Sequence, residues 1–181
     1  MAETTRHVSW QAGDSYEAYM GRWSRQIAPL FLDWLGANDG LDWLEVGCGS
    51  GALSAAILER CKPRTLVSID PSKGFVSTAR ANVPDERAEL RVGDAQALAL
   101  ETASRDVIAS ALVLNFVPDK EMALAEMKRV VRSGGMTGFY VWDYPGGGVE
   151  FMPVFWNEAT ALDPGALSLT EDSRLFARRI A

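Results

Sequence analysis

The sequence predicts an α/β protein built on a doubly wound parallel sheet, with strand order 3-2-1-4-5 and helices on both faces. Three observations support this fold class. Short apolar runs that end in a polar residue alternate with segments of helical periodicity, the connections are short, and a glycine-rich turn joins the first run to a helix. Ligands of such sheets bind outside the carboxyl ends of the strands, where the strand order reverses. Here that point lies between strands 1 and 4.

The stretch LDWLEVGCGSGAL, residues 41–53, contains the first strand, a tight glycine turn and the start of a helix. Gly47, Gly49 and Gly51 let backbone N–H groups approach a ligand closely, and the positive end of the helix dipole favours bound negative charge. A ligand with a carboxylate or a phosphate is therefore expected. The turn alone does not identify it, because Gly47, Gly49 and Ala52 also match the pattern of dinucleotide-binding proteins.

Four further strands are expected along the chain. They are TLVSID (65–70), AELRVGD (88–94), DVIASALVL (106–114) and MTGFYVWDY (136–144). The intervening helices are predicted over residues 52–60, from Pro71 and Ser72 onward, and over residues 122–131. A last amphipathic helix is predicted over residues 150–161, with Phe151, Val154, Phe155 and Ala159 facing inward.

The N-terminal region divides into a loosely held start, residues 1–15, and an aromatic segment, residues 16–36. Helical spacing of Ile27, Phe31, Trp34 and Leu35 predicts a helix there that ends at Gly36, with Ser24 as a candidate N-cap and Pro29 as a kink. Two interpretations remain open. The segment is either a lid that brings Tyr16 or Arg22 to a ligand carboxylate, or a helix held against the sheet by its aromatic rings.

Composition sets limits on the function. The chain has 181 residues, 48% of them hydrophobic, and a net charge of −6, which predicts one domain and argues against a nucleic-acid or anionic-membrane surface. No apolar run approaches the roughly 20 residues that span a bilayer, and the start has no signal-peptide pattern, so a cytoplasmic protein is expected. Cys48, Cys61 and the single histidine are too few for a zinc site, so no metal is expected and both cysteines are interpreted as free thiols.

Four polar residues are predicted to line one rim of the sheet. Glu45, Asp70, Asp94 and Asn115 all lie at or just past the carboxyl ends of strands. Asp70 suits both hydroxyls of a ribose, and the less favoured alternative is an acid that bonds the N–H groups that open the next helix. Asp94, followed by Ala95, suits an adenine amino group, or simply the N-cap of a short turn.

The motifs EVGCGSG, SIDPS, VGDAQAL and LVLNFVPD resemble those of class I S-adenosylmethionine-dependent methyltransferases, in particular the type 11 or UbiE-like small-molecule group, over Tyr16 to about Tyr144. The resemblance implies a Rossmann-like domain over residues 37–181 and S-adenosylmethionine as cofactor. It assigns the methionine end of the cofactor to Glu45 and the backbone of the three glycines, and the ribose to Asp70. Pro71 and Ser72 would flank the adenine, and Asp94 with Ala95 would bind its amino group. The sulfonium would lie near Leu114 and Asn115, and Tyr16 and Arg22 would belong to the lid.

The resemblance further implies an enzyme that transfers a methyl group to a small-molecule acceptor. Orientation of the reactants and exclusion of water supply most of such catalysis. His7, Tyr16, Tyr144 and Asp143 are candidates for a general base, but nothing in their spacing selects one, so no catalytic residue is assigned. The sequence LNFV lacks an NPPY-like pattern, which favours a carbon or oxygen acceptor in a small metabolite.

The sequence departs from the family after the fifth strand. The family's closing hairpin, strands 7 and 6, has no counterpart before Ala181, so the domain is expected to be C-terminally incomplete, with an exposed fifth strand. A homodimer formed through that edge is one arrangement that would cover it. Two alternatives to an active methyltransferase stay open: an inactive or partner-dependent cofactor-binding fragment and, more distantly, an NAD(P)-dependent oxidoreductase.

Overall fold

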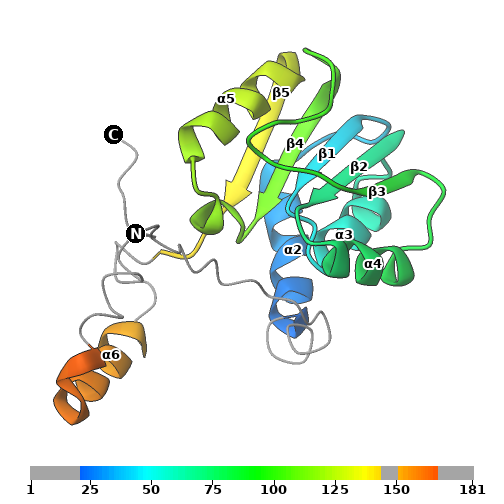
Figure 1. The fold of residues 1–181 in the computed structure, drawn as a ribbon. Helices are drawn as coiled ribbons and strands as arrows, with labels where there is room; N and C mark the ends of the chain where they lie inside the picture. The colour runs from blue at the N-terminus through cyan, green and yellow to red at the C-terminus, as the bar shows by residue number, and fades with distance from the viewer. Residues whose placement is uncertain (1–20, 144–150, 167–181) are drawn as a thin grey trace.

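The structure is a computed structural model, and it describes residues 21–143 and 151–166. Within these residues five parallel strands form a single sheet. They are β1 (Asp42–Val46), β2 (Thr65–Asp70), β3 (Ala88–Val92), β4 (Arg105–Ala111) and β5 (Val131–Tyr140). Their order is β3-β2-β1-β4-β5, which confirms the predicted topology (Figure 1). The carboxyl ends of β1 and β4 therefore lie next to each other at the switch in strand order.

Three helices cover one face of the sheet. They are α2 (Arg22–Leu35), α3 (Ala52–Arg60) and α4 (Lys73–Asn82), and they lie behind the sheet in Figure 1. Their apolar side chains form one core cluster with Trp43 of β1, Leu66 of β2 and Val107 of β4. Successive side chains of a strand point to opposite faces, so this cluster takes every second residue of the central strands.

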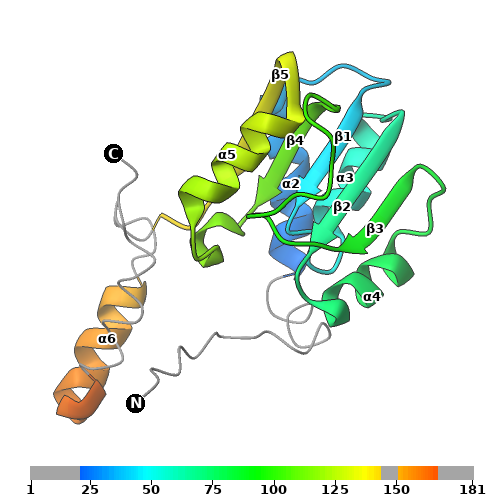
Figure 2. The same cartoon turned by 45° about the horizontal axis from the view of Figure 1, so that its top comes forward.

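The other face is covered by α5 (Lys120–Val130) and by the segment between β3 and β4 (Figure 2). Leu44, Val67 and Ile108 of the sheet pack there against residues of α5 such as Met127, and against Leu98 of the segment. Because both faces are covered, all five residues of β1 are buried. Trp43 therefore enters the core on one face and Leu44 and Val46 enter the core on the other, whereas the buried acids Asp42 and Glu45 are held by hydrogen bonds.

Local sequence signals set the ends of several helices as predicted. The Ser72 hydroxyl accepts a hydrogen bond from Phe75 N (3.3 Å) at the start of α4. Asp119 plays the same part for α5, since its carboxylate accepts a hydrogen bond from Met122 N (2.9 Å). Gly36 ends α2 in the left-handed conformation, at φ 64°.

The buried face of α2 differs from the prediction. The helix begins at Arg22, without Ser24 as its cap, and contains Pro29. Its buried residues are Ala28, Phe31 and Leu32, whereas Ile27 and Trp34 are 38% and 74% exposed. Tertiary contact decides this, because the ring of Phe31 packs edge-on against Tyr140 of β5, with 5.0 Å between the ring centroids. Of the predicted apolar positions, Phe31 is buried and Leu35 packs against its cluster.

Two strand boundaries also differ from the prediction. β4 ends at Ala111 because Leu112 takes a left-handed backbone conformation, at φ 59°, and the short 3-10 helix η2 (Leu114–Phe116) follows. β5 starts at Val131, immediately after α5, although its continuous pairing with β4 begins only at Met136.

The last predicted helix is present as α6 (Phe151–Leu162), followed by the 3-10 helix η3 (Pro164–Ala166). Its predicted inward residues Val154 and Phe155 are 62% and 57% exposed, so that part of the prediction is wrong. Figures 1 and 2 both show α6 lying away from the sheet, which leaves its apolar side chains without a core to enter. No helix in the described part of the chain is long and apolar enough to cross a membrane.

Candidate ligand site at the carboxyl ends of the strands

The glycine turn that follows β1 is bonded to the end of β2. Gly47 N and Cys48 N both donate to the carbonyl of Ile69, at 2.8 and 2.9 Å. Gly49 N donates to the Asp70 carboxylate (3.0 Å), and Gly51 N donates to the carbonyl of Cys48 (2.9 Å). The N–H groups of all three glycines therefore have acceptors within the chain. α3 has no side-chain cap at its start, so the N–H groups of its first turn are available to a ligand.

The three glycines are required for different reasons. All have positive φ, which L side chains rarely adopt. A Cβ at Gly47 would lie 2.2 Å from Cγ2 of Val113, and one at Gly51 would lie 2.8 Å from Cγ2 of Val83, so both positions are closed by packing. A Cβ at Gly49 would meet no atom of the described residues within 4 Å. Gly49 is thus the point of the turn that faces open space, where a ligand can approach the backbone.

Asp70 links the glycine turn to the start of α4. One carboxylate oxygen accepts from Gly49 N, and the other accepts from Ser72 N (2.9 Å). The helix-opening role that the sequence left open is therefore present. A carboxylate has about four lone-pair sites, so two remain for further donors such as ribose hydroxyls. The side chain is buried, and this burial raises the pKa of Asp70 above its usual value.

Glu45 is enclosed beneath the turn, and only 1% of its surface is exposed. Its Oε2 accepts hydrogen bonds from the hydroxyls of Ser54 on α3 and Ser68 on β2, the latter at 2.8 Å. Its Oε1 is buried and has no hydrogen-bond partner among the described residues. Burial raises the pKa of Glu45 to about 7. The predicted contact of Glu45 with the methionine end of a cofactor stays a prediction, and Oε1 is the atom available for it.

The ends of β4 and β5 are joined by Asn115. Its side-chain nitrogen donates to the carbonyl of Trp142 (3.1 Å), and its side-chain oxygen accepts from Trp142 N (2.9 Å). Leu114 beside it is 5% exposed and belongs to the core on the α5 face. Both residues lie at the predicted rim, but their observed contacts are structural.

Neither Val113 nor Leu112 was identified from the sequence as a residue of the rim. Val113 packs against Gly47, and Leu112 has positive φ and donates from its N to the carbonyl of Tyr140 (2.8 Å). Such backbone conformations are costly for branched residues and occur often at functional sites. No local pattern distinguishes either residue within the continuous apolar run ALVL.

Asp94 lies next to this rim, because Gly93 N donates to the carbonyl of Asp70 (3.1 Å). Its own carboxylate accepts from Gln96 N (2.9 Å), so the turn-capping interpretation is present here. Asp94 is exposed and Ala95 is buried against the core, while Pro71 is exposed beyond the end of β2. Their predicted contacts with an adenine stay predictions.

The lid residues are only partly described. Arg22 is exposed in the first turn of α2, with its guanidinium carbon 5.0 Å from the ring centroid of Trp23. Figure 1 shows this end of α2 on the side of the sheet where the strand arrowheads lie. Tyr16, together with His7 and Tyr144, lies outside the described residues, and Asp143 is exposed at the end of the first described range.

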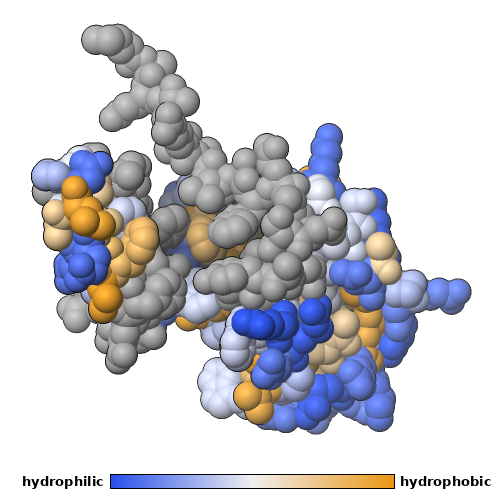
Figure 3. Space-filling model, turned by 90° about the horizontal axis from the view of Figure 1, so that it is seen from below, coloured by the Kyte–Doolittle hydropathy of each residue, from blue (hydrophilic) through white to orange (hydrophobic). Residues whose placement is uncertain are grey.

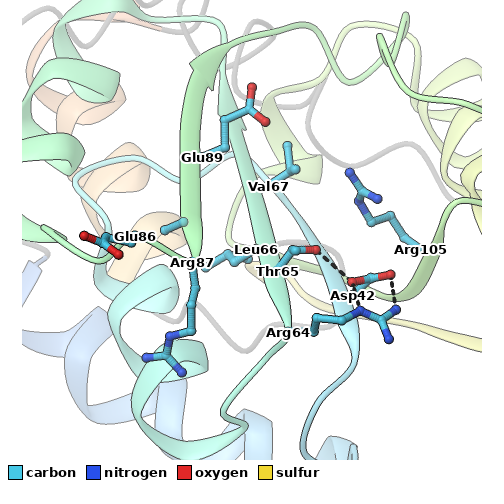
Figure 4. Close-up of a pocket in the computed structure, with 10 residues that line it drawn as sticks. Asp42, Arg64, Thr65, Leu66, Val67, Glu86, Arg87, Glu89 and Arg105 are labelled. Atoms are coloured by element: carbon cyan, nitrogen blue, oxygen red, sulfur yellow. Dashed lines mark hydrogen bonds and ion pairs between the residues drawn. The ribbon is translucent and has the colours of Figure 1, made fainter.

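A hollow of about 610 Å³ lies at the opposite end of the sheet, among the amino ends of β1 to β4 (Figure 4). Its lining includes Asp42, Arg64, Thr65 and Arg105. It contains none of the rim residues named above. The candidate ligand site is therefore defined by its polar groups and by the space at Gly49, and the hollow is a separate feature.

The rim offers chemically distinct groups to a ligand. The uncapped start of α3 suits an anion, Asp70 has spare acceptor sites for hydroxyl groups, and Glu45 Oε1 is a buried acceptor without a donor. An amino-acid group joined to a ribose contains the matching carboxylate, ammonium and diol. The group implied by the sequence resemblance, S-adenosylmethionine, therefore fits the residues present.

Known proteins resemble the chain in sequence and in fold. The chain is 34% identical over 118 residues to the ubiquinone biosynthesis O-methyltransferase of Leptothrix cholodnii, covering 61% of this chain and 49% of that protein. It is 30% identical over 127 residues to nocamycin O-methyltransferase of Saccharothrix syringae, covering 68% and 45%. A candidate S-adenosyl-L-methionine-dependent methyltransferase of Methanococcus maripaludis has a similar fold, with a TM-score of 0.64, 22% identity and coverage of 88% and 73%.

The chain spans about half the length, or less, of the curated relatives it matches. Residues 44–139, more than half of the chain, match the family described as the methyltransferase domain. The chain thus belongs to the methyltransferase-domain family.

Proposed function

We propose that this chain binds S-adenosylmethionine at the carboxyl ends of β1, β2 and β4 and transfers its methyl group to a small-molecule acceptor. The observation that carries the proposal is the hydrogen bond between Gly49 N and Asp70. It joins a glycine turn with open space at Gly49 to a buried carboxylate with spare acceptor sites. This arrangement presents an anion-binding helix start and a diol acceptor side by side.

The acid before the turn argues against a dinucleotide. The first turn of α3 could hold the pyrophosphate of a dinucleotide as well as the carboxylate of S-adenosylmethionine, so the glycine turn alone does not separate the two cofactors. A dinucleotide does not ordinarily need an acid two residues before the first glycine, whereas the amino group of S-adenosylmethionine gives Glu45 a partner. Glu45 and the match of residues 44–139 to the methyltransferase domain therefore disfavour an oxidoreductase that uses NAD(P).

In the proposed complex, the first turn of α3 would hold the carboxylate of the cofactor and Asp70 its ribose. Glu45 Oε1 would accept a hydrogen bond from the amino group, and Asp94 with Ala95 would contact the adenine beside Pro71 and Ser72. Leu114 and Asn115 would border the reacting end, with Tyr16 and Arg22 at its entrance. The cofactor supplies a methyl group on a sulfonium, which is activated before it binds. The residues around it then have to orient the acceptor and exclude water.

Calorimetric titration with S-adenosylmethionine and with NADH tests the cofactor. Saturable binding of S-adenosylmethionine is expected, whereas binding of NADH alone would contradict the proposal. Transfer of label from methyl-labelled S-adenosylmethionine to a pool of small metabolites tests the reaction. Tight cofactor binding without transfer to any acceptor would favour the alternative of an inactive or partner-dependent domain.

We also propose a homodimer, because the β5 edge of the sheet is uncovered in the described part of the chain. β5 pairs only with β4 within the described part of the chain, and its residues Thr137, Phe139 and Val141 are exposed on one face. Figure 3 shows further hydrophobic surface on α6, which follows β5 in the chain. An open edge beside apolar side chains is a surface on which a second copy can add its own edge strand.

Light scattering after size-exclusion chromatography measures this association. Phe139→Lys is expected to reduce the mass from that of a dimer to that of a monomer, because it places a charge beside the edge. Leu30→Lys on α2 is the matched control, since Leu30 is 68% exposed on another element. A monomeric wild-type chain, or equal effects of both variants, would refute the homodimer.

A further inference from the structure

The hollow at the amino ends of the strands contains a group of charges that the cofactor site does not use. Asp42 at the start of β1 lines the hollow, and Asp106 near the start of β4 lies next to Asp42 because β1 pairs with β4. Asp42 is 7% exposed, so its charge needs compensation by neighbouring groups.

Two arginines supply that compensation. Arg64 donates to both carboxylate oxygens of Asp42, and its Nη2 lies 3.9 Å from Asp106. Arg132 bridges the two acids, with 3.2 Å to Asp42 and 2.5 Å to Asp106. Thr65 Oγ1 also donates to Asp42 (2.8 Å), and Asp42 N donates to Asp106 (2.8 Å). The two carboxylates are therefore neutralised by two guanidinium groups, and two further donors, Thr65 Oγ1 and Asp42 N, are bonded to them.

Arg105 is a third guanidinium in the same cluster, and it forms no ion pair with any carboxylate of the described residues. One of its terminal nitrogens donates to the carbonyl of its neighbour Ser104 (2.9 Å). Its Nε is buried and has no hydrogen-bond partner there. Figure 4 shows the guanidinium turned towards Val67, with no interaction drawn to another lining residue. Burial lowers the pKa of Arg105, as expected for a cation whose lost hydration is not replaced.

The remaining charges around the hollow do not neutralise Arg105. Glu89 forms its ion pair with Arg91 (3.1 Å), and Arg87 forms its own with Asp85 (2.7 Å). Glu86 lies across the hollow and points away from Arg105 in Figure 4. One guanidinium without an ion-pair partner among the described residues therefore lines the hollow, in a protein whose net charge is −6.

We propose that this hollow is a second binding site, for a small molecule with a single carboxylate, and that Arg105 binds the carboxylate. A guanidinium can donate two parallel hydrogen bonds to a carboxylate, and the terminal nitrogens of Arg105 make only the bond to Ser104 among the described residues. The volume of about 610 Å³ lies within the range of small-molecule sites.

The charge of the cluster favours a monocarboxylate over a phosphate. Three guanidinium groups, of Arg64, Arg105 and Arg132, face two carboxylates, which leaves one positive charge. A monoanion balances that charge. A dianionic phosphate would leave an excess negative charge beside Asp42 and Glu89, at the cost of like-charge repulsion.

Nuclear magnetic resonance of the arginine Nε–H groups tests the proposal on the complete chain, with sodium acetate, sodium benzoate, sodium phosphate and sodium chloride compared at equal ionic strength. One Nε–H resonance is expected to shift and saturate with acetate or benzoate, and to be absent from Arg105→Lys. Binding of the carboxylate should weaken at least tenfold in Arg105→Gln. Arg87→Gln, which changes an exposed arginine of the same lining, should bind as the wild type does.

Several results would overturn the assignment. A shift that grows linearly without saturation, or that chloride reproduces, would mean ionic screening only. An equal loss of affinity for the carboxylate in Arg87→Gln and Arg105→Gln would show that Arg105 has no specific role. Tighter binding of phosphate than of either carboxylate would refute the charge argument. The wild-type titration decides the matter even if Arg105→Gln fails to fold. Titration with S-adenosylmethionine in parallel keeps this site separate from the cofactor site.

Discussion

Alanine substitutions at Gly47 and Gly49 should separate the stability of the glycine turn from its accessibility to a ligand. An L residue in the left-handed region costs about 1–2 kcal/mol at either position. At Gly47 the new Cβ would also lie 2.2 Å from Val113 Cγ2, and overpacking of this kind costs about 1–3 kcal/mol more. Gly47→Ala should therefore lower the free energy of unfolding by about 2–5 kcal/mol, and Gly49→Ala by about 1–2 kcal/mol.

The two variants should rank in the opposite order for ligand binding at a temperature where both are folded. The Cβ at Gly49 would lie more than 4 Å from every atom of the described residues outside its immediate neighbours, and would occupy the space next to the backbone. Gly49→Ala should thus weaken binding of S-adenosylmethionine at least tenfold, with little loss of stability. Urea unfolding at 25 °C gives the first quantity and calorimetric titration gives the second.

Val113→Ala supplies the control for the Gly47 argument. It removes the two nearest contact atoms and leaves only Cβ, 2.8 Å from the new methyl group. Gly47→Ala should therefore be less costly in the Val113→Ala background than in the wild type. Equal stability losses in Gly47→Ala and Gly49→Ala, or purely additive effects of Gly47→Ala and Val113→Ala, would refute the packing argument.

Three other predictions follow from the rim. Asp70→Ala should weaken binding of S-adenosylmethionine by about 1–3 kcal/mol through lost charged hydrogen bonds, and an unchanged affinity in calorimetric titration would contradict the ribose role. Burial raises the pKa of Glu45 in the folded state to about 7, from an ordinary value of 4.5, so the folded state binds the extra proton and stability should fall as pH rises from about 4.5 through 7. Glu45→Gln should remove up to about 3 kcal/mol of that decline, measured by urea unfolding at pH 5 and pH 8, and identical pH profiles would disprove it. Asn115→Ala should lose both bonds to Trp142 and about 1–3 kcal/mol of stability, with faster hydrogen exchange at the Trp142 amide; unaltered exchange would count against the bracing role.

Several features could be predicted from the sequence alone because local patterns along the chain specify them. The sheet order follows from strands and helices that alternate through short connections. Ser72 and Gly36 act at helix ends through bonds to groups three or four residues away. The location of the candidate site at Gly49 and Asp70 follows in the same way, since the residues after parallel strands meet at one edge.

Tertiary structure decided which groups at that edge are available to a ligand. Gly47 N donates to the carbonyl of Ile69, and Gly49 N donates to the Asp70 carboxylate. The Asn115 side chain is bonded to Trp142, which lies 27 residues later in the chain. The buried face of α2 likewise depends on Tyr140. A residue's own type and spacing show that it can donate or accept a hydrogen bond. Its actual partner is a residue distant in sequence, and packing alone brings the two together.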